Sequence, residues 1–382
     1  MRSGNIECIN WFMKVALIHD YLIRFGGAER VFLNLRKIFP KAEIFTLLYD
    51  EKKMGHYFQN TKIHTSFLQK FPKFWRNRQK YLLPFIPMAP ETFDLREFDL
   101  IISSSNSFVK GIITRPQAIH ICYCHSPMRF GWDAYTSYVQ QQRKGFLTNM
   151  AIRIIMHYIR IWDKSAASRV DYFIANSKST AGRIEKFYGR ESKVIYPPVV
   201  LDSMNTRVGF KDYFLIVSQL TPYKQIDLAV RAFNKLGIPL VIIGEGPEKK
   251  GLQEMARDNI KFLGWQSDEV VKQYFQNCRA FLFPGEDDFG IAPVEAMGFG
   301  KPVLAYRRGG ATETILEGIT GDFFDDLTPE GLADGVRRLL LNIDNYSPLL
   351  IRKRAEKFSQ ERFERAIKEF VIEVVEQHKK RF

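Results

Sequence analysis

Short apolar runs alternate with segments of helical periodicity along almost the whole of this chain of 382 residues. A parallel strand needs a crossover before its neighbour can pair with it, so this alternation is typical of α/β folds with parallel sheets. A second strand–loop–helix series starts near Tyr213, after an irregular segment at 196–212. We therefore expect two doubly wound, Rossmann-like domains at 13–200 and 210–345, and a basic helical tail at 346–382.

The runs that predict strands are short and rich in aliphatic and aromatic residues. In the first half they lie at 15–19, 42–48, 100–103, 118–124, 172–176 and 193–197. In the second half they lie at 213–217, 239–243, 260–263, 280–283 and 302–305. Ligands of such sheets bind beyond the carboxyl ends of the strands, so polar residues that follow these runs are the candidates for a site.

The most informative strand end is the segment 285–305, GEDDFGIAPVEAMGFGKPVLA. Asp287 and Gly290 fall on a strand-to-helix loop, and Glu295 falls about one turn into the helix. The N-terminus of a helix exposes unpaired backbone N–H groups that suit a phosphate, whereas carboxylates accept hydrogen bonds from hydroxyl groups. A loop that offers both describes a sugar-nucleotide site.

Two further strand ends bring glycines to a helix start. The segment FGGAE places Gly26 and Gly27 after the first strand, where a backbone without side chains can approach a ligand closely. The segment IGEGPE places Gly244 and Gly246 where the backbone can accept a nucleotide base. A tight turn into the following helix explains each of these segments as well.

Charged and titratable residues follow two other strands. Lys224 stands near a helix start after the strand at 213–217, where it can neutralise a diphosphate. His125 directly follows the strand at 118–124 and is a candidate substrate contact, although a buried histidine is often only a satisfied core residue. Arg129 and Asp133 follow on the same loop as further candidates for an acceptor or phosphate contact.

The cysteine content and the lengths of the apolar runs indicate the cellular compartment. The four cysteines do not make a disulfide framework, which indicates a reducing, cytoplasmic compartment. Cys122 and Cys124 alternate on one apolar run, and a metal site there would need two more ligands. No run reaches the roughly 18 apolar residues of a membrane span. The first twelve residues lack the apolar core of a signal peptide, and we expect them to be a lead-in to Met13.

The net charge of +14 is compatible with nucleic acid, an anionic membrane or phosphorylated substrates. The segment 67–87, FLQKFPKFWRNRQKYLLPFIP, mixes basic and aromatic residues without acids, which favours contact with an anionic membrane surface. The segment 146–164 predicts a helix with a basic stripe, for which a solvated face is the simpler interpretation. No recognised nucleic-acid module is present, so we expect no nucleic-acid partner.

Taken together, these segments resemble the retaining glycosyltransferases of family 4, which have the GT-B fold. The matching pieces are GGAER, HSPMRFGWD, NSKSTAGRIEKFYG, SQLTPYKQIDLAVRAF, IGEGP, FLGW and DDFGIAPVEAMGFGKPVLAYRRGGATETI. The likeness runs from Met13 to about residue 341, and the last piece is the most specific. HSPMR and YPPV resemble the branch with bacterial mannosyltransferases of surface-polysaccharide assembly. The family resemblance implies two domains facing a cleft, with the C-terminal helix packing back on the N-terminal domain.

The resemblance implies roles for residues of both domains. Lys224 would bind the donor diphosphate, Glu295 the ribose, and Asp287 hydroxyls of the transferred sugar. In the N-terminal domain, Gly26 and Gly27 would approach the diphosphate. Backbone amides of the loop at Phe289, Gly290 and Ile291 would cap a phosphate or sugar oxygen. His125 would contact the sugar near its reacting carbon.

Two positions depart from the family pattern. The family has two glutamates separated by seven residues, and here Asp287 stands at the first position, one methylene shorter. The family also pairs its lysine with an arginine five residues earlier, where this chain has Gln219. A glutamine can donate a hydrogen bond to a phosphate but brings no charge, which weakens stabilisation of the leaving diphosphate.

The resemblance implies transfer of a sugar from a nucleotide diphosphate to an acceptor hydroxyl, with retention at the anomeric carbon. Mannose from GDP-mannose is the favoured donor group, and a lipid-linked saccharide in surface-polysaccharide synthesis is the favoured acceptor, at the inner face of the plasma membrane. No Asp-x-Asp occurs in the chain, so we expect neither a metal nor another cofactor. A nucleotide-sugar epimerase or phosphorylase on the same fold, a non-catalytic nucleotide-sugar binder and a basic nucleic-acid binder are the alternatives.

Overall fold

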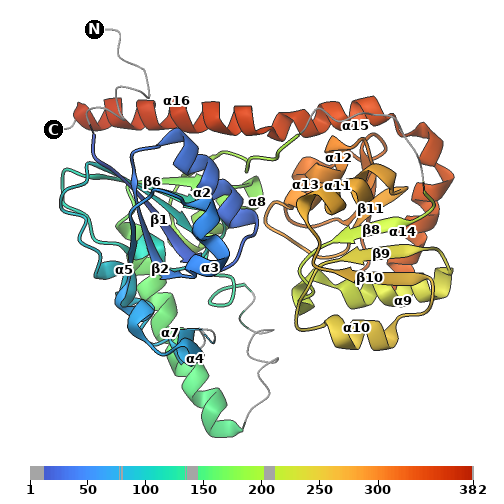
Figure 1. The fold of residues 1–382 in the computed structure, drawn as a ribbon, viewed down its shortest axis with the longest axis horizontal. Helices are drawn as coiled ribbons and strands as arrows, with labels where there is room; N and C mark the ends of the chain where they lie inside the picture. The colour runs from blue at the N-terminus through green and yellow to red at the C-terminus, as the bar shows by residue number, and fades with distance from the viewer. Residues whose placement is uncertain are drawn as a thin grey trace. The chain divides into compact units, whose positions relative to one another are not determined.

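The computed structural model describes residues 13–76, 78, 81–133, 135, 145–201 and 211–380, and for residues 146 and 147 the backbone alone. The expected lead-in at 1–12 lies outside these residues. The chain divides into two compact units (Figure 1). The first ends at Pro198 and takes up the chain again from Phe363; the second is Val199–Arg362. The helical tail expected at 346–382 is therefore divided between the two units.

The first unit is built on a sheet of seven described strands, all paired in parallel in the order β3-β2-β1-β4-β5-β6-β7. The strands are β1 (Val15–Leu22), β2 (Glu43–Tyr49), β3 (Ile63–Thr65), β4 (Leu100–Ser105), β5 (Ile119–Cys124), β6 (Tyr172–Ala175) and β7 (Ser192–Val194). The central strands β4 and β5 are buried along their whole length, as expected for a parallel sheet covered on both faces.

Helices cover both faces of this sheet. They are α2 (Gly27–Ile38), α3 (Glu51–Met54), α4 (Lys73–Arg76), α5 (Met88–Glu91), α7 (Phe146–Ser168), α8 (Lys178–Tyr188) and α16 (Gln360–Lys379), with the short 3-10 turns η1 (Gly55–Tyr57), η2 (Phe67–Lys70) and η4 (Val109–Gly111). The sequence explains where α8 begins and ends: the Ser177 hydroxyl accepts from the Thr180 amide at 3.1 Å, and Gly189 ends the helix with a φ of 67°.

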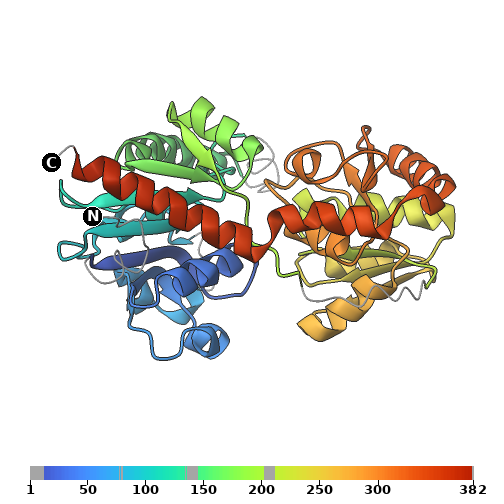
Figure 2. The same cartoon turned by 90° about the horizontal axis from the view of Figure 1, so that it is seen from above.

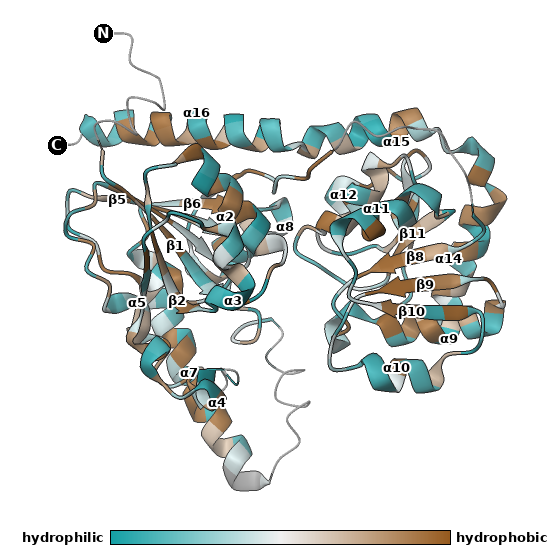
Figure 3. Ribbon diagram, viewed as in Figure 1, coloured by the Kyte–Doolittle hydropathy of each residue, from teal (hydrophilic) through white to brown (hydrophobic). Residues whose placement is uncertain are grey.

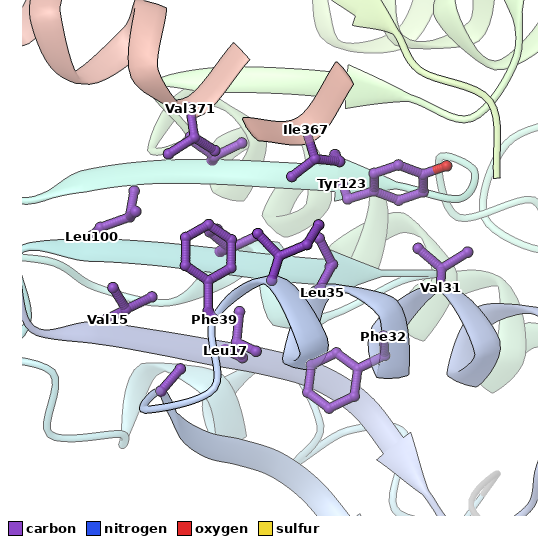
Figure 4. Packing of buried hydrophobic residues seen from close by; sticks show 14 of the residues in the cluster. Val15, Leu17, Val31, Phe32, Leu35, Phe39, Leu100, Tyr123, Ile367 and Val371 are labelled. Atoms are coloured by element: carbon purple, nitrogen blue, oxygen red, sulfur yellow. The ribbon is translucent and has the colours of Figure 1, made fainter. Parts of the chain in front are cut away.

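The C-terminal helix α16 packs on the first sheet, as the family resemblance implied (Figure 2). Figure 4 shows Ile367 and Val371 of α16 beside Leu100 and Tyr123 of the sheet. Phe32, Leu35 and other residues of α2 belong to the same buried cluster. Helices from the two ends of the chain therefore close one core.

The second unit contains a sheet of six described strands, again all parallel, in the order β10-β9-β8-β11-β12-β13. They are β8 (Phe214–Val217), β9 (Leu240–Ile243), β10 (Ile260–Gly264), β11 (Ala280–Phe283), β12 (Val303–Tyr306) and β13 (Gly321–Phe324). In Figure 3 the strands β8, β9 and β10 are brown, in keeping with the apolar runs that predicted them.

The helices of the second unit follow its strands in turn. They are α9 (Ile226–Leu236), α10 (Lys249–Met255), α11 (Asp268–Asn277), α12 (Ile291–Gly298), α13 (Ala311–Thr314), α14 (Pro329–Leu341) and α15 (Pro348–Ala355), with the 3-10 turns η5 (Pro222–Lys224), η6 (Ile343–Asn345) and η7 (Glu356–Phe358). Thr328 caps α14 by accepting from the Gly331 amide at 3.1 Å, and Pro329 occupies the first helical position.

The predicted α/β class, the two parallel sheets and all eleven predicted strands are confirmed, with ends that shift by at most three residues. Two strands were missed. The strand β3 has only three residues, Ile-His-Thr, and lies at the edge of its sheet. The strand β13 begins with Gly321 and Asp322, two residue types that are depleted in strands.

A buried ion pair joins η4 to α7 in the first unit. Lys110 Nζ lies 2.5 Å from Asp163 Oδ1, and both side chains are buried. Burial lowers the pKa of Lys110, but the Asp163 carboxylate outweighs this effect and leaves the pKa raised. The other Asp163 oxygen accepts from Trp132 Nε1 at 2.7 Å and from the Tyr188 hydroxyl at 2.9 Å. The loop after β5 is thereby anchored to α7.

Asp20, in β1, organises the loop after β4. Its Oδ2 accepts from the amides of Asn106 at 2.6 Å and Ser107 at 2.9 Å. Its Oδ1 accepts from the amides of Phe108 and Val109, both at 2.9 Å. A carboxylate can satisfy four donors in this way because each oxygen has two lone pairs.

We expect Asp20→Asn to destabilise the protein by about 3 kcal/mol, because the carboxamide nitrogen cannot accept and leaves buried amides unsatisfied. The measurement is the midpoint of urea unfolding for the full chain. Asp94→Asn is the matched control, because Asp94 pairs with Arg96 at an exposed position, and it should leave the midpoint unchanged. Equal midpoints for Asp20→Asn and the wild type would contradict this role.

Candidate functional site

The predicted residues of the second unit follow three neighbouring strands. Gln219 and Lys224 follow β8, Gly244 follows β9, and Asp287 and Glu295 follow β11. These strands are neighbours in the order β9-β8-β11 and are parallel, so their carboxyl ends lie at one edge of the sheet. The structure thus brings the predicted residues of the second unit to a single sheet edge.

Lys224 and Asp287 form an ion pair at this edge between Nζ and Oδ2. Both side chains keep some exposure, 15% for Lys224 and 20% for Asp287. Burial lowers the pKa of Lys224, but Asp287 outweighs it and the pKa is raised, so the ammonium group stays charged. Lys224 Nζ also lies 5.1 Å from the centre of the Tyr223 ring. The aspartate, although shorter than the glutamate of the family pattern, reaches the lysine.

Glycines allow this contact. A Cβ added at Gly285 would lie 2.8 Å from Lys224 Cα, so only glycine lets the loop after β11 approach η5 so closely. On the other side, the Gly310 amide donates to the Asp287 carbonyl at 2.9 Å. A Cβ added at Gly309, whose φ is +61°, would lie 2.2 Å from that same oxygen. Gly309 and Gly310 therefore pack against the backbone of Asp287, a contact that the sequence did not predict.

The helix α12 begins directly after this loop, with Gly290 at a φ of +83° as the residue that precedes it. No acidic residue occupies its first turn, so its first amides, from Ile291 on, face no carboxylate of that turn. Phe289 is buried at 3% exposure and packs on Phe358 with ring centres 5.5 Å apart. Only its backbone is therefore available to a ligand. Glu295 is partly buried, on the first turn and a half of the helix.

Gly244 and Gly246 have a packing role whatever they bind. A Cβ at Gly244 would lie 1.8 Å from the Ser218 carbonyl oxygen, and one at Gly246 would lie 2.2 Å from that of Leu220. The loops after β8 and β9 are thus pressed together through bare backbone. Base binding at these two glycines stays a prediction.

Gln219 is exposed, and its side chain makes no hydrogen bond to the residues that the structure describes. Its carbonyl oxygen accepts from the Thr221 amide at 3.0 Å. Lys224 is therefore the cation that this edge offers close to Asp287.

In the first unit, His125 directly follows β5, as predicted, and is buried at 8% exposure. Its Nε2 lies 2.8 Å from the Ser104 hydroxyl. Its carbonyl oxygen accepts from the Thr180 hydroxyl at 3.3 Å. Burial lowers the pKa of His125 to about 3, and the neighbouring His19 adds a smaller effect in the same direction. The imidazole is therefore neutral at physiological pH. It can act in hydrogen bonds but brings no charge.

Gly26 and Gly27 stand at the start of α2, as predicted. Gly26 is extended, with a φ of −159°, and Gly27 is the first helical residue. The first turn of α2 also contains Glu29, and a Cβ at Gly26 would lie 3.0 Å from Glu29 Oε2. The helix start therefore already carries a negative charge, which opposes the attraction of this helix end for a diphosphate.

Asp133 has protein partners in the structure. Its Oδ2 lies 3.0 Å from Arg183 Nε of α8 and 3.7 Å from Arg129 Nε. Asp133 is thus already paired with two guanidinium groups of the protein, and its contact with an acceptor stays a prediction. Residues 134 and 136–144 lie outside the described part of the chain.

Three residues around His125 were missed by the sequence analysis. They are His19 in β1, Ser104 in β4 and Glu29 in α2, which are joined to His125 by hydrogen bonds. The signal for His19 and Ser104 in the sequence is a polar residue at the end of an apolar run, and Glu29 lies in the GGAER piece. Cys122, Cys124 and Cys278 are buried and form no disulfide within the described residues. Within the described residues, no three His, Cys, Asp or Glu side chains gather so as to hold a metal ion.

Two family models match the chain. The model for glycosyltransferase family 4 matches residues 25–203, and the model for glycosyl transferases group 1 matches residues 205–362. These two matches meet at the boundary between the two sheets.

Named relatives agree with these matches. An alpha-1,3/1,6-mannosyltransferase of Saccharomyces cerevisiae is 25% identical over 96% of this chain and 86% of its own. A GDP-mannose-dependent alpha-mannosyltransferase of Corynebacterium glutamicum is 33% identical over 141 residues, 36% of this chain and 34% of its own. Among solved structures, the HepE protein of Anabaena, crystallised with UDP, superposes with a TM-score of 0.66 at 17% identity, over 94% of this chain and 99% of its own. The chain therefore belongs to the group 1 glycosyl transferases, with an N-terminal half of glycosyltransferase family 4, and is a glycosyltransferase of GT-B fold.

Proposed function

We propose that the protein transfers mannose from GDP-mannose to a hydroxyl group of a lipid-linked saccharide, with retention at the anomeric carbon. The observation that carries the proposal is the Lys224–Asp287 pair beside the start of α12. It puts a cation, hydroxyl acceptors and free helix amides within one loop system, which is the set that a sugar diphosphate needs. Mannose and GDP come from the names of the yeast and Corynebacterium relatives.

In the proposed reaction the bond between the anomeric carbon and the leaving phosphate oxygen breaks. A bond from the same face of the sugar forms to the acceptor oxygen, and the acceptor proton passes to the leaving phosphate. Negative charge grows on the diphosphate in the transition state. Lys224 and the amides of α12 stabilise that charge, while Asp287 accepts from hydroxyls of the sugar. Glu295 binds the ribose, and His125 contacts the sugar near its reacting carbon. The step needs no nucleophile from the protein and no metal.

The two departures from the family pattern favour one competing function, a protein that binds a nucleotide sugar without transferring it. Lys224 has no arginine partner at position 219, and its charge is balanced by Asp287. Binding without turnover would support that alternative.

The proposal extends to an anionic membrane surface. Exposed aromatic residues of the segment 67–87 accompany its basic ones; they are Phe74, Trp75, Tyr81 and Phe85. The helix α7 adds exposed apolar residues at helical spacing, Met150, Ile154, Tyr158 and Ile161 (Figure 3). Residues of both segments, including Leu82 and Ile159, pack in one buried cluster, so the exposed groups come from elements of one body. No helix in the described part of the chain is long and apolar enough to cross a bilayer.

We expect Lys224→Ala to lower transfer roughly a thousandfold, because the charge that grows on the diphosphate loses its cation. Initial rates with GDP-mannose and a lipid-linked saccharide measure it. Lys235→Ala is the matched control, since Lys235 forms an exposed pair with Glu330 in the same unit, and its rate should equal that of the wild type. Unchanged transfer in Lys224→Ala would refute the assignment.

We expect GDP-mannose, without added metal, to raise the melting temperature of the protein more than UDP-glucose does at equal concentration. A bound ligand stabilises the folded state in proportion to the logarithm of its concentration over its Kd, so the ranking of shifts ranks the donors. A chelator should leave both the shift and the rate unchanged. A larger shift with UDP-glucose would replace mannose as the transferred sugar, and a shift without turnover would favour the non-catalytic alternative.

We expect the protein to float with vesicles that contain phosphatidylglycerol and not with pure phosphatidylcholine vesicles. The double variant Phe74→Glu/Trp75→Glu should weaken this binding at least about tenfold, since it replaces inserted rings by charges that the membrane repels. Leu341→Glu is the control, at an exposed apolar position of the second unit. Binding that the double variant leaves intact would exclude the segment 67–87 as the contact.

A further inference from the structure

A chain of hydrogen bonds leads from the start of α2 to His125. Glu29 Oε1 lies 3.3 Å from His19 Nε2, and His19 Nδ1 lies 3.1 Å from the Ser104 hydroxyl. The same hydroxyl lies 2.8 Å from His125 Nε2. All four side chains are buried, at 0 to 9% exposure. Four polar groups are thus connected end to end, although the mechanism proposed above uses only the last.

The sheet explains why these residues meet. His19 and Ser104 are register partners of β1 and β4, and Ser104 is in turn the register partner of Tyr123 in β5. His125 lies two residues after Tyr123, so its side chain returns to the same face of the sheet. The first turn of α2 covers this face and supplies Glu29.

Aromatic contacts hold both imidazole rings in place. His19 stacks on Phe32 of α2 with ring centres 4.8 Å apart. The His125 ring packs edge-on against Tyr123 at 5.2 Å and against His19 at 6.4 Å. The Tyr123 hydroxyl donates to the Ile195 carbonyl at 2.9 Å, which fixes Tyr123 itself. The chain is therefore a packed structure rather than a chance alignment of surface groups.

The chemistry of the members gives the chain a direction. A carboxylate can only accept, so His19 donates from Nε2 to Glu29; in the arrangement with this one proton on the ring, Nδ1 keeps a lone pair. That lone pair accepts from the Ser104 hydroxyl, whose oxygen then accepts from His125 Nε2. His125 must in consequence carry its proton on Nε2 and a lone pair on Nδ1.

We propose that Glu29, His19 and Ser104 are positioning residues that hold His125 as the Nε2–H tautomer, with Nδ1 as an acceptor for a hydroxyl of the transferred sugar. The choice of partner rests on the proposed function, in which His125 contacts the sugar; the tautomer does not. No hydrogen bond joins His125 Nδ1 to any residue that the structure describes. A lone pair there accepts from a sugar hydroxyl and cannot donate to a phosphate oxygen, so the chain selects which part of the donor His125 can bind.

The tautomer is tested directly by nitrogen NMR of the full chain with ¹⁵N-labelled histidine at pH 7.5. Comparison with His125→Ala assigns the His125 signals. We expect a neutral ring with its proton on Nε2 in the wild type. In Ser104→Ala, which removes one hydroxyl and little volume, we expect a mixture of the two tautomers. A wild-type ring protonated on Nδ1, or on both nitrogens, overturns the proposal, as does a Ser104→Ala spectrum identical to that of the wild type.

Transfer assays test whether Glu29 acts through His125. We expect Glu29→Gln to lower kcat roughly tenfold, the effect of weakening one hydrogen bond in the transition state, and to leave the KM for donor unchanged. In the His125→Ala background the same substitution should change nothing further, because its target is gone. Effects that multiply would mean that Glu29 acts through the fold, and would overturn the proposal.

Glu43→Gln is the matched control for both measurements. Glu43 accepts from His64 Nε2 at 2.7 Å, the same carboxylate–imidazole pair elsewhere in the first unit. This variant should leave the His125 spectrum and the transfer rate as in the wild type. If no donor supports transfer at all, the proposed function fails, while the NMR result still decides the tautomer.

Discussion

Parallel strands place all of their carboxyl ends at one edge of a sheet, and the loops that follow must share that edge. In the second unit these loops approach one another at glycines, where bare backbone lies against its neighbour. Gly244 and Gly246 lie against the loop after β8, Gly285 against Lys224, and Gly309 and Gly310 against the loop that carries Asp287. A side chain at any of these positions would separate two loops. The contact between Lys224 and Asp287 depends on this close packing, and so does any site built on it.

The polar side chains of the two units differ in exposure and in charge. At the edge of the second sheet a lysine and an aspartate keep partial exposure, and the raised pKa of the lysine keeps it charged. In the first unit the residues around His125 are buried and linked in series, and burial keeps His125 neutral. A diphosphate needs an accessible charge, whereas a hydroxyl contact near a reacting carbon needs a group that is fixed in position. These environments support the roles proposed for Lys224 and His125.

The sequence was sufficient for features that depend on local patterns. A few adjacent residues are enough to predict a buried strand such as β11 or a helix start such as that of α12. The positions of His125 and Lys224 at strand ends followed from the same patterns. Contacts between distant segments did not. Lys224 and Asp287 are 63 residues apart, and His19 and Ser104 are 85 apart. Their pairing depends on strand order and register, which periodicity does not determine.

The packing of these loops also bears on the two departures from the family pattern. A change from glutamate to aspartate at position 287 shortens the side chain by one methylene, yet the loop held by Gly285 and Gly310 still brings the carboxylate to Lys224. The shorter side chain therefore still reaches the lysine. The change at position 219 is of another kind, because a missing charge cannot be restored by moving a loop. Of the two departures, the glutamine is therefore the one that should limit the stabilisation of a leaving diphosphate.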